Sequence, residues 1–188
     1  MGLKIITKQR KKKEKKGGGL AIGYLDDGKT KIEELKVDHS DILVVEGLVR
    51  GIKIRIILTY MGCSKNKTGK EYDENRKKQR LIEKYFEVDP DVALICLGDM
   101  NGRLKTIEPL IETDSNGQMI IDWTKKTNLH HLNLSDKCNG RYTFHSKNGK
   151  SAIDHILVND IMMQYFRGMN IDENKELLDI SDHCLVRS

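Results

Sequence analysis

Residues 91–103, DVALICLGDMNGR, decide the fold of this chain. Residues 92–97 form a continuous apolar run of strand length, which predicts a buried strand. The run stops at residues 98–101, Gly-Asp-Met-Asn, where Asp and Asn bond to nearby backbone and Gly tolerates a positive φ. Taken alone, this tetrapeptide is a tight turn. It becomes a candidate for chemistry when other segments bring similar groups to the same sheet edge.

Short apolar runs separated by polar turns continue on both sides of this segment. The turns at 26–28 and 50–51 predict hairpin connections. In residues 52–60, an isoleucine or leucine at every even position from 52 to 58 predicts one better-buried face. Many strands with few helices indicate a layered α/β or α+β domain. Strands are expected at residues 19–25, 32–37, 42–49, 52–60, 129–134, 142–146, 152–158 and 183–186, and helices at 70–88 and 118–128.

Composition excludes several protein classes. The chain has 188 residues, of which 38% are hydrophobic and 32% charged, with 16 Gly and 2 Pro. This profile is globular and excludes collagen-like or fully disordered chains. No apolar run reaches the roughly 18 residues of a membrane span, and the first residues do not have the order of a secretory signal. The 4 cysteines form no CxxC pair, so we expect a reducing compartment, cytoplasmic or nuclear, without a zinc site.

The net charge of +5 is concentrated at one end of the chain. Residues 1–16 carry most of the excess of lysine and arginine, so we divide the chain into a basic segment, 1–16, and a domain, 17–188. A run of this kind can contact phosphate groups or act as a nuclear signal, and it can equally be a solvated tail. The candidate nucleic-acid contacts are Lys11, Lys12, Lys13, Lys15 and Lys16.

Two further segments combine a strand with polar groups at its end. They are SAIDHILV at 151–158 and SDH at 181–183. A carboxylate such as Asp154 inside an apolar strand requires a partner, because an unpaired buried charge costs several kcal/mol. Ser181 and Asp182 alone could form a turn or cap, with His183 facing solvent.

Taken together and in this order, GDMN, SAIDHILV and SDH resemble the endonuclease/exonuclease/phosphatase superfamily. GGGLAIGY at 17–24 and IILTYMG at 56–62 lie where that superfamily has two of its strands, so the resemblance covers nearly the whole chain. YTFHS at 142–146, shortly before SAIDHILV, is similar to the apurinic/apyrimidinic-type endonuclease domains of non-LTR retrotransposons, which accompany a reverse transcriptase.

The resemblance implies roles for four residues. Asp99 matches the aspartate that orients or deprotonates the attacking water, and general-base help of this kind contributes about 10²–10⁴ in rate. Asn101 matches an asparagine that donates to phosphate oxygens. His183 matches the histidine that binds or protonates the phosphoryl group. Asp154 matches the carboxylate that hydrogen-bonds to this histidine and raises its pKa.

The resemblance also implies a metal ion and a substrate. Asp182 matches an acidic residue on the metal side, and Tyr60 matches a tyrosine near the scissile phosphate. Mg²⁺, or Mn²⁺ in its place, would suit these oxygen ligands. The implied activity is metal-dependent hydrolysis of DNA phosphodiester bonds, leaving a 3′-hydroxyl and a 5′-phosphate.

The chain departs from the superfamily pattern near its start. The superfamily opens with a strand that carries an Asn and a strand that carries a metal-binding Glu, and nothing upstream of Gly17 matches either. We therefore expect a DNase I-like four-layer α/β/β/α sandwich that is N-terminally truncated, as part of a longer polyprotein. The sheet edge would be exposed, so we expect self-association through it or a cap formed by residues 3–7.

Three functions follow from these observations. The first is a retrotransposon-type endonuclease, with an activity that the missing Glu could impair. The second is a catalytically inactive relative that binds nucleic acid. The third is a phosphatase acting on a small phosphorylated substrate.

Overall fold

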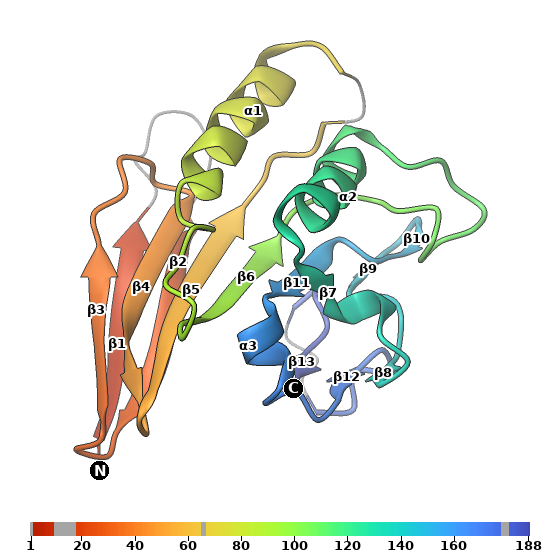
Figure 1. The fold of residues 1–188 in the computed structure, drawn as a ribbon. Helices are drawn as coiled ribbons and strands as arrows, with labels where there is room; N and C mark the ends of the chain where they lie inside the picture. The colour runs from red at the N-terminus through yellow and green to blue at the C-terminus, as the bar shows by residue number, and fades with distance from the viewer. Residues whose placement is uncertain (1, 10–17, 65–66, 178–180) are drawn as a thin grey trace.

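The computed structural model describes residues 2–9, 18–64, 67–177 and 181–188 (Figure 1). Its centre is a six-stranded sheet in which β5 and β6 are parallel and the other neighbours are antiparallel. In spatial order its strands are β3 (Thr30–Leu35), β4 (Ile42–Val49), β5 (Ile52–Tyr60), β6 (Ala93–Asp99), β11 (Asp154–Val158) and β7 (His130–His131).

Two helices cover one face of this sheet: α1 (Lys70–Glu83) and α2 (Ser115–Thr127) (Figure 1). The Asp114 side chain caps α2 by accepting a hydrogen bond from the Gly117 amide at 2.7 Å. Trp123 of α2 is fully buried and meets Phe86 edge-on at 5.2 Å between ring centroids. Both helices expected from the sequence are confirmed. The first ends earlier than predicted, and the second begins earlier.

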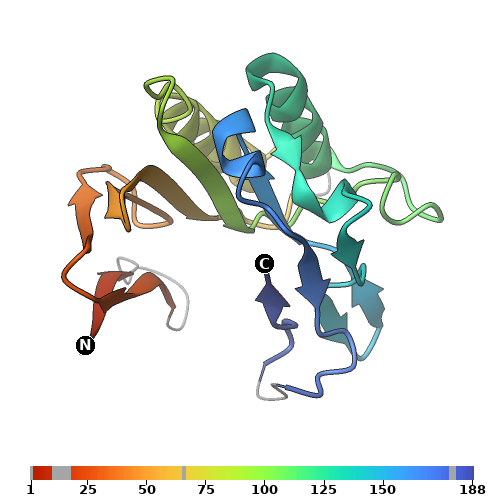
Figure 2. The same cartoon turned by 60° about the horizontal axis from the view of Figure 1, so that its bottom comes forward.

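Smaller strands lie on the opposite face of the large sheet, as Figure 2 shows. The hairpin of β1 (Gly2–Gln9) and β2 (Gly19–Asp26) packs its inner side chains on β4 and β5. Toward the C-terminal half lie β8 (Cys138–Asn139), the pair β9 (Phe144–Ser146) and β10 (Gly149–Ser151), α3 (Asp160–Met163), β12 (Met169–Ile171) and β13 (Val186–Arg187). The expected α/β sandwich is confirmed.

The strand predictions hold in the first half of the chain better than in the second. Residues 42–49 and 52–60 are strands with the predicted bounds, and Arg50 and Gly51 join them with φ of 50° and 91°. The predicted strand at 129–134 was wrong in part, because only two residues pair and a 3₁₀ turn, Leu132–Leu134, follows. The hairpin predicted at 26–28 was also wrong, because β2 and β3 belong to different sheets.

The buried face of β5 is a further correction. Ile57 and Thr59 are the fully covered side chains, under the helices, whereas Ile56 and Leu58 are half-buried against the hairpin. Both faces of this strand are covered by protein, so alternation alone did not identify the better-buried face.

The first described residues form a strand. β1 pairs with β2 along its whole length, from Gly2 opposite Asp26 to Gln9 opposite Gly19, so residues 3–7, expected as a cap on a sheet edge, lie alongside β2. The boundary expected at residue 16 and the lysines at 11, 12, 13, 15 and 16 lie outside the described residues and stay predictions. In the part of the chain that the structure describes, no helix is long and apolar enough to cross a membrane.

Candidate active site

The strand register places three predicted site residues in one row. Tyr60 of β5 is paired with Asp99 of β6, and Asp99 is paired with Asp154 of β11. Residues directly opposite each other in a sheet project from the same face. Ile95 on β6 and Ile156 on β11 lie an even number of residues from Asp99 and Asp154, so they project from the same face. Both pack in the hydrophobic core on the face away from α1 and α2. The row therefore lies where β5 and β6 end and β11 begins, on the face that carries the smaller strands.

His183 reaches this row from the last segment of the chain. Its backbone forms an isolated antiparallel bridge with Phe144, and the two rings meet at 5.0 Å between centroids. The flanking residues are also bound to this strand: the His145 amide donates to the Asp182 carbonyl at 2.8 Å, and the Cys184 amide donates to the Thr143 carbonyl at 2.7 Å. The backbone of His183 is consequently fixed on both sides.

Three of the predicted residues form a continuous group. His183 Nδ1 lies 2.9 Å from Asp154 Oδ2 and 3.1 Å from Oδ1, so the Nδ1 proton is donated to this carboxylate. The other ring nitrogen, Nε2, lies 3.9 Å from Asp99 Oδ2. The side chains of Asp99, Asp154 and His183 are 19%, 24% and 37% exposed. The predicted partner of the buried Asp154 is thus His183.

Burial changes the acidity of Asp99. Loss of hydration raises the pKa of its carboxyl to about 6, and the nearby Asp154 carboxylate also raises it. His183 and a hydrogen bond from the Asn101 amide, at 3.1 Å, act in the opposite direction. A carboxylate with a pKa close to neutral pH is a stronger proton acceptor than an exposed aspartate.

The pKa of His183 shifts in the direction that keeps its ring charged. Its hydrogen bond to Asp154 raises the pKa above the ordinary 6.5, against the effect of burial, and the charges of Asp154 and Asp99 add to the increase. A half-exposed imidazole whose pKa is raised, beside a carboxylate whose pKa is also raised, combines a proton donor with a proton acceptor.

Asn101 lies in the loop that follows Asp99. Its φ is 45°, in the left-handed region, and its Nδ2 donates to the Met61 carbonyl at 2.9 Å. It therefore ties the loop after β6 to the loop after β5. Its side chain also faces the Asp99 carboxylate, whose pKa it lowers.

The sequence prediction missed two buried amides behind these loops. Asn116, at the start of α2, donates to the carbonyls of Gly62 (3.0 Å), Met100 (2.9 Å) and Asn101 (3.2 Å). Asn75, from α1, exchanges two hydrogen bonds with Gly62 and donates to Asn116 Oδ1 at 3.1 Å.

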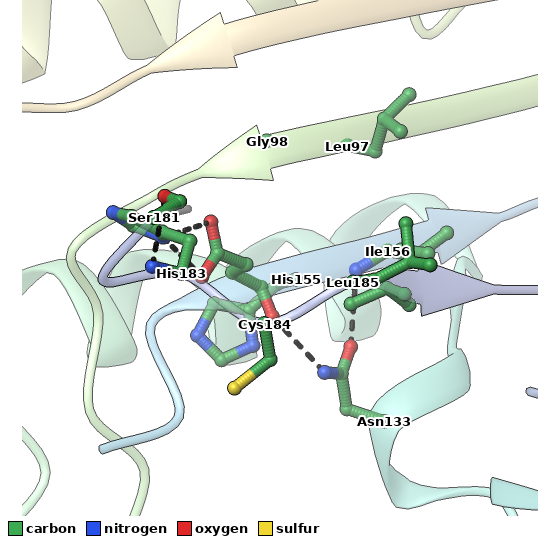
Figure 3. A pocket seen from close by; sticks show the side chains of 11 residues that line it. Leu97, Gly98, Asn133, His155, Ile156, Ser181, His183, Cys184 and Leu185 are labelled. Atoms are coloured by element: carbon green, nitrogen blue, oxygen red, sulfur yellow. Dashed lines mark hydrogen bonds and ion pairs between the residues drawn. The ribbon is translucent and has the colours of Figure 1, made fainter. Parts of the chain in front are cut away.

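An apolar hollow of about 290 Å³ lies beside His183 (Figure 3). Leu97 and Ile156 come from the large sheet, and Leu185 and Val186 come from the final segment. Asn133 closes one side, where it donates to the Asp154 carbonyl and accepts from the Ile156 amide, both at 3.0 Å. His155 also lines this hollow, and its Nε2 lies 2.7 Å from the Gly102 carbonyl on the other side of β11.

The remaining predicted residues lie at the margins of the group. Asp182 is exposed beside His183, and Tyr60 is half-buried at the end of its row. No cluster of three or more His, Cys, Asp or Glu in the described ranges could hold a metal ion. Mg²⁺ often takes only one or two protein carboxylates and completes its shell with water and phosphate oxygens. The carboxylates of Asp99, Asp154 and Asp182 are donors of the kind that this ion binds.

Comparison with protein families gives one match that covers most of the chain. A family model described as Endonuclease-reverse transcriptase matches residues 54–187, a range that contains the whole group of Tyr60, Asp99, Asn101, Asp154 and His183. No curated protein sequence matches the chain.

Solved structures with the same fold come from DNA-processing proteins. The endonuclease domain of TRAS1, a telomere-specific non-LTR retrotransposon, has a TM-score of 0.72 at 19% identity, over 99% of this chain and 77% of that one. The 3′ phosphatase NExo from Neisseria, bound to a product DNA hairpin, has 0.69 at 16%, over 98% and 78%. The AP endonuclease LMAP from Leishmania major has 0.71 at 13%, over 98% and 69%.

Proposed function

Because the chain belongs to the Endonuclease-reverse transcriptase family, within the retrotransposon type of the endonuclease/exonuclease/phosphatase superfamily, we propose that it hydrolyses phosphodiester bonds in DNA as an endonuclease. The observation that carries this proposal is the Asp154–His183–Asp99 group, with contacts of 2.9 Å and 3.9 Å at one sheet edge. The closeness of an imidazole with a raised pKa to a carboxylate with a raised pKa supports the roles of phosphate binding and proton acceptance that are proposed below.

Asp99 is proposed as the proton acceptor. Above pH 6 its carboxylate is ionised, and it takes a proton from the water that attacks phosphorus. The P–O3′ bond breaks in the same reaction, and the leaving 3′-oxygen takes a proton from solvent to give the 3′-hydroxyl. Its position 3.9 Å from His183 Nε2 leaves no direct hydrogen bond between the two groups. A water can therefore donate to Asp99 and accept from His183 Nε2 at the same time.

His183 is proposed to stabilise the phosphoryl group. Asp154 fixes its tautomer and orientation by accepting the Nδ1 proton, so Nε2 carries the proton that is presented to a phosphate oxygen. Asn101 would donate a side-chain hydrogen bond to the oxygens of the same group, and Tyr60 would contact the scissile phosphate. Charge-assisted donors of this kind are effective because they are already oriented when charge develops.

A divalent cation, Mg²⁺ or Mn²⁺, is proposed as the cofactor. Asp182 is the residue that would hold it, with water and substrate oxygens as the other ligands. When bound, the ion would neutralise charge on the phosphate and leaving group.

DNA is the proposed partner, and the lysines at 11–13, 15 and 16 are proposed to contact its backbone. Salt dependence tests this contact, because each neutralised phosphate releases counterions. Replacing the five lysines by Gln should weaken binding at low salt and flatten the salt dependence. An unchanged slope would exclude the contact.

Self-association is proposed for the outer face of the β1–β2 hairpin. Leu3, Ile5 and Leu25 are 67%, 58% and 58% exposed there, and Leu3 is directly opposite Leu25, so they form one apolar patch on this face. Light scattering should show a concentration-dependent mass that Leu3→Lys abolishes. A monomer at all concentrations would contradict this proposal.

Nicking of supercoiled plasmid tests the proposed activity. With Mg²⁺, the wild-type chain should convert plasmid to the open circle with 3′-hydroxyl and 5′-phosphate ends, whereas Asp99→Ala and His183→Ala, both folded, should not. DNA retention without nicking would favour the inactive binding protein. Release of phosphate from a small ester without nicking would favour the phosphatase.

A further inference from the structure

Thr143 is a buried polar residue that the proposed mechanism does not use. It lies immediately before β9 and is 0% exposed. Its backbone joins two segments: its amide donates to the Ser151 carbonyl at 3.0 Å, and its carbonyl accepts from the Cys184 amide at 2.7 Å. Through the second bond it fixes the residue that follows His183.

The hydroxyl of Thr143 contacts the Asp154 side of the Asp154–His183 pair. Its Oγ1 accepts from the amide of Ile153 at 3.1 Å and from the amide of Asp154 at 3.0 Å. Amides of consecutive residues in a regular strand point in opposite directions, whereas here both converge on one oxygen. The Ile153 carbonyl accepts from the amide of Met100, the residue directly after β6, at 3.0 Å.

One residue thus holds both members of the Asp154–His183 pair. The hydroxyl fixes the start of β11 and the backbone carbonyl fixes the His183 segment. The neighbouring Phe144 bridges His183 directly. We infer that Thr143 is a positioning residue that sets the Asp154–His183 contact. The expected effect on the cleavage rate rests on the proposed function, whereas the expected effect on the Asp154–His183 hydrogen bond does not.

Two substitutions separate the hydroxyl from the shape of the side chain. Thr143→Val keeps the shape and removes the acceptor, whereas Thr143→Ser keeps the acceptor and removes one methyl group. At saturating DNA we expect Thr143→Val to lower the cleavage rate about 10- to 100-fold, the scale of an approximately 1 Å misplacement of reacting groups. DNA affinity should stay unchanged, and Thr143→Ser should remain within about 3-fold of the wild type.

A control and a second readout keep the inference testable. Thr30→Val removes the hydroxyl of another buried threonine, 8% exposed, in β3 far from the group, and it should not lower the rate per folded molecule. The NMR resonance of the His183 Hδ1 proton reports its bond to Asp154 without any activity. It should persist in Thr143→Ser and disappear in Thr143→Val.

The outcomes are distinguishable. If the wild type does not cleave DNA, the proposed function fails, and the Hδ1 resonance still decides the role of Thr143. If Thr143→Val does not fold, Thr143→Ala, in which a water can replace the hydroxyl, should show a weakened resonance. A wild-type rate and resonance in Thr143→Val, or a defect in Thr143→Ser as large as in Thr143→Val, would overturn the inference.

Discussion

Replacing Asp99 by Asn should abolish cleavage and at the same time stabilise the protein. The native pKa is about 6 against an ordinary 3.8, and one pKa unit corresponds to about 1.4 kcal/mol, so the ionised carboxylate destabilises the fold by about 3 kcal/mol at neutral pH. Asparagine removes this charge and keeps an oxygen that accepts from the Asn101 amide. Loss of activity with gain of stability is the behaviour of a residue retained for function.

The sign of the effect sets its pH window. The native pKa lies above the unfolded value, so ionisation destabilises the fold as pH rises from 3.8 through 6, and the full effect is present above about 6. Urea unfolding in EDTA should therefore show Asp99→Asn more stable than wild type by up to about 3 kcal/mol at pH 7.5 and by less than about 1 kcal/mol at pH 4.

The control for this experiment is Asp122→Asn. Asp122 is an exposed aspartate on α2 whose carboxylate accepts from Gln118, and its replacement should change stability little at either pH. An Asp99→Asn variant that is destabilised at pH 7.5, or stabilised equally at both pH values, would refute the account of Asp99 as a buried, ionised carboxylate.

Three further predictions follow from the same contacts. The kcat/KM for cleavage should fall about tenfold per pH unit below pH 6, where Asp99 becomes protonated; a profile flat to pH 5 would contradict its role. EDTA should abolish nicking and Mg²⁺ or Mn²⁺ should restore it, while circular dichroism stays unchanged; nicking that persists in EDTA would exclude the cation. Asn116→Ala removes the side-chain donor to the carbonyls of Met100 and Asn101 and should cost about 2–3 kcal/mol in urea unfolding; a wild-type midpoint would show that water replaces the amide.

The main sheet and the Asp154–His183 pair could be predicted from local sequence. The apolar runs of β4, β5 and β6 are long and bounded by turn residues, so their positions follow from pattern alone. Asp154 interrupts such a run, and the cost of an unpaired buried charge requires a nearby partner. The SDH segment supplied a histidine for that purpose, and the structure places it at 2.9 Å.

What could not be predicted depends on contacts between distant segments. Thr143 and Asp154 are bound through a hydroxyl, and nothing local to Thr143 distinguishes it from an ordinary buried threonine. The orientation of β5 was misjudged because a strand covered on both faces carries no reliable alternation. The turn at 26–28 has hairpin residues, but its flanking strands pair with other partners, β1 and β4.

The central claim is that Asp154 and His183 act as one unit in cleaving DNA, and a double-mutant cycle on the cleavage rate tests it most directly. Single-turnover cleavage of a labelled duplex would be measured for the wild type, Asp154→Ala, His183→Ala and the double variant. We predict that each single change lowers the rate about 100-fold or more and that the double variant is no slower than His183→Ala, because residues that act together are not additive. Independent, multiplicative losses, or a His183→Ala rate equal to that of the wild type, would contradict the account.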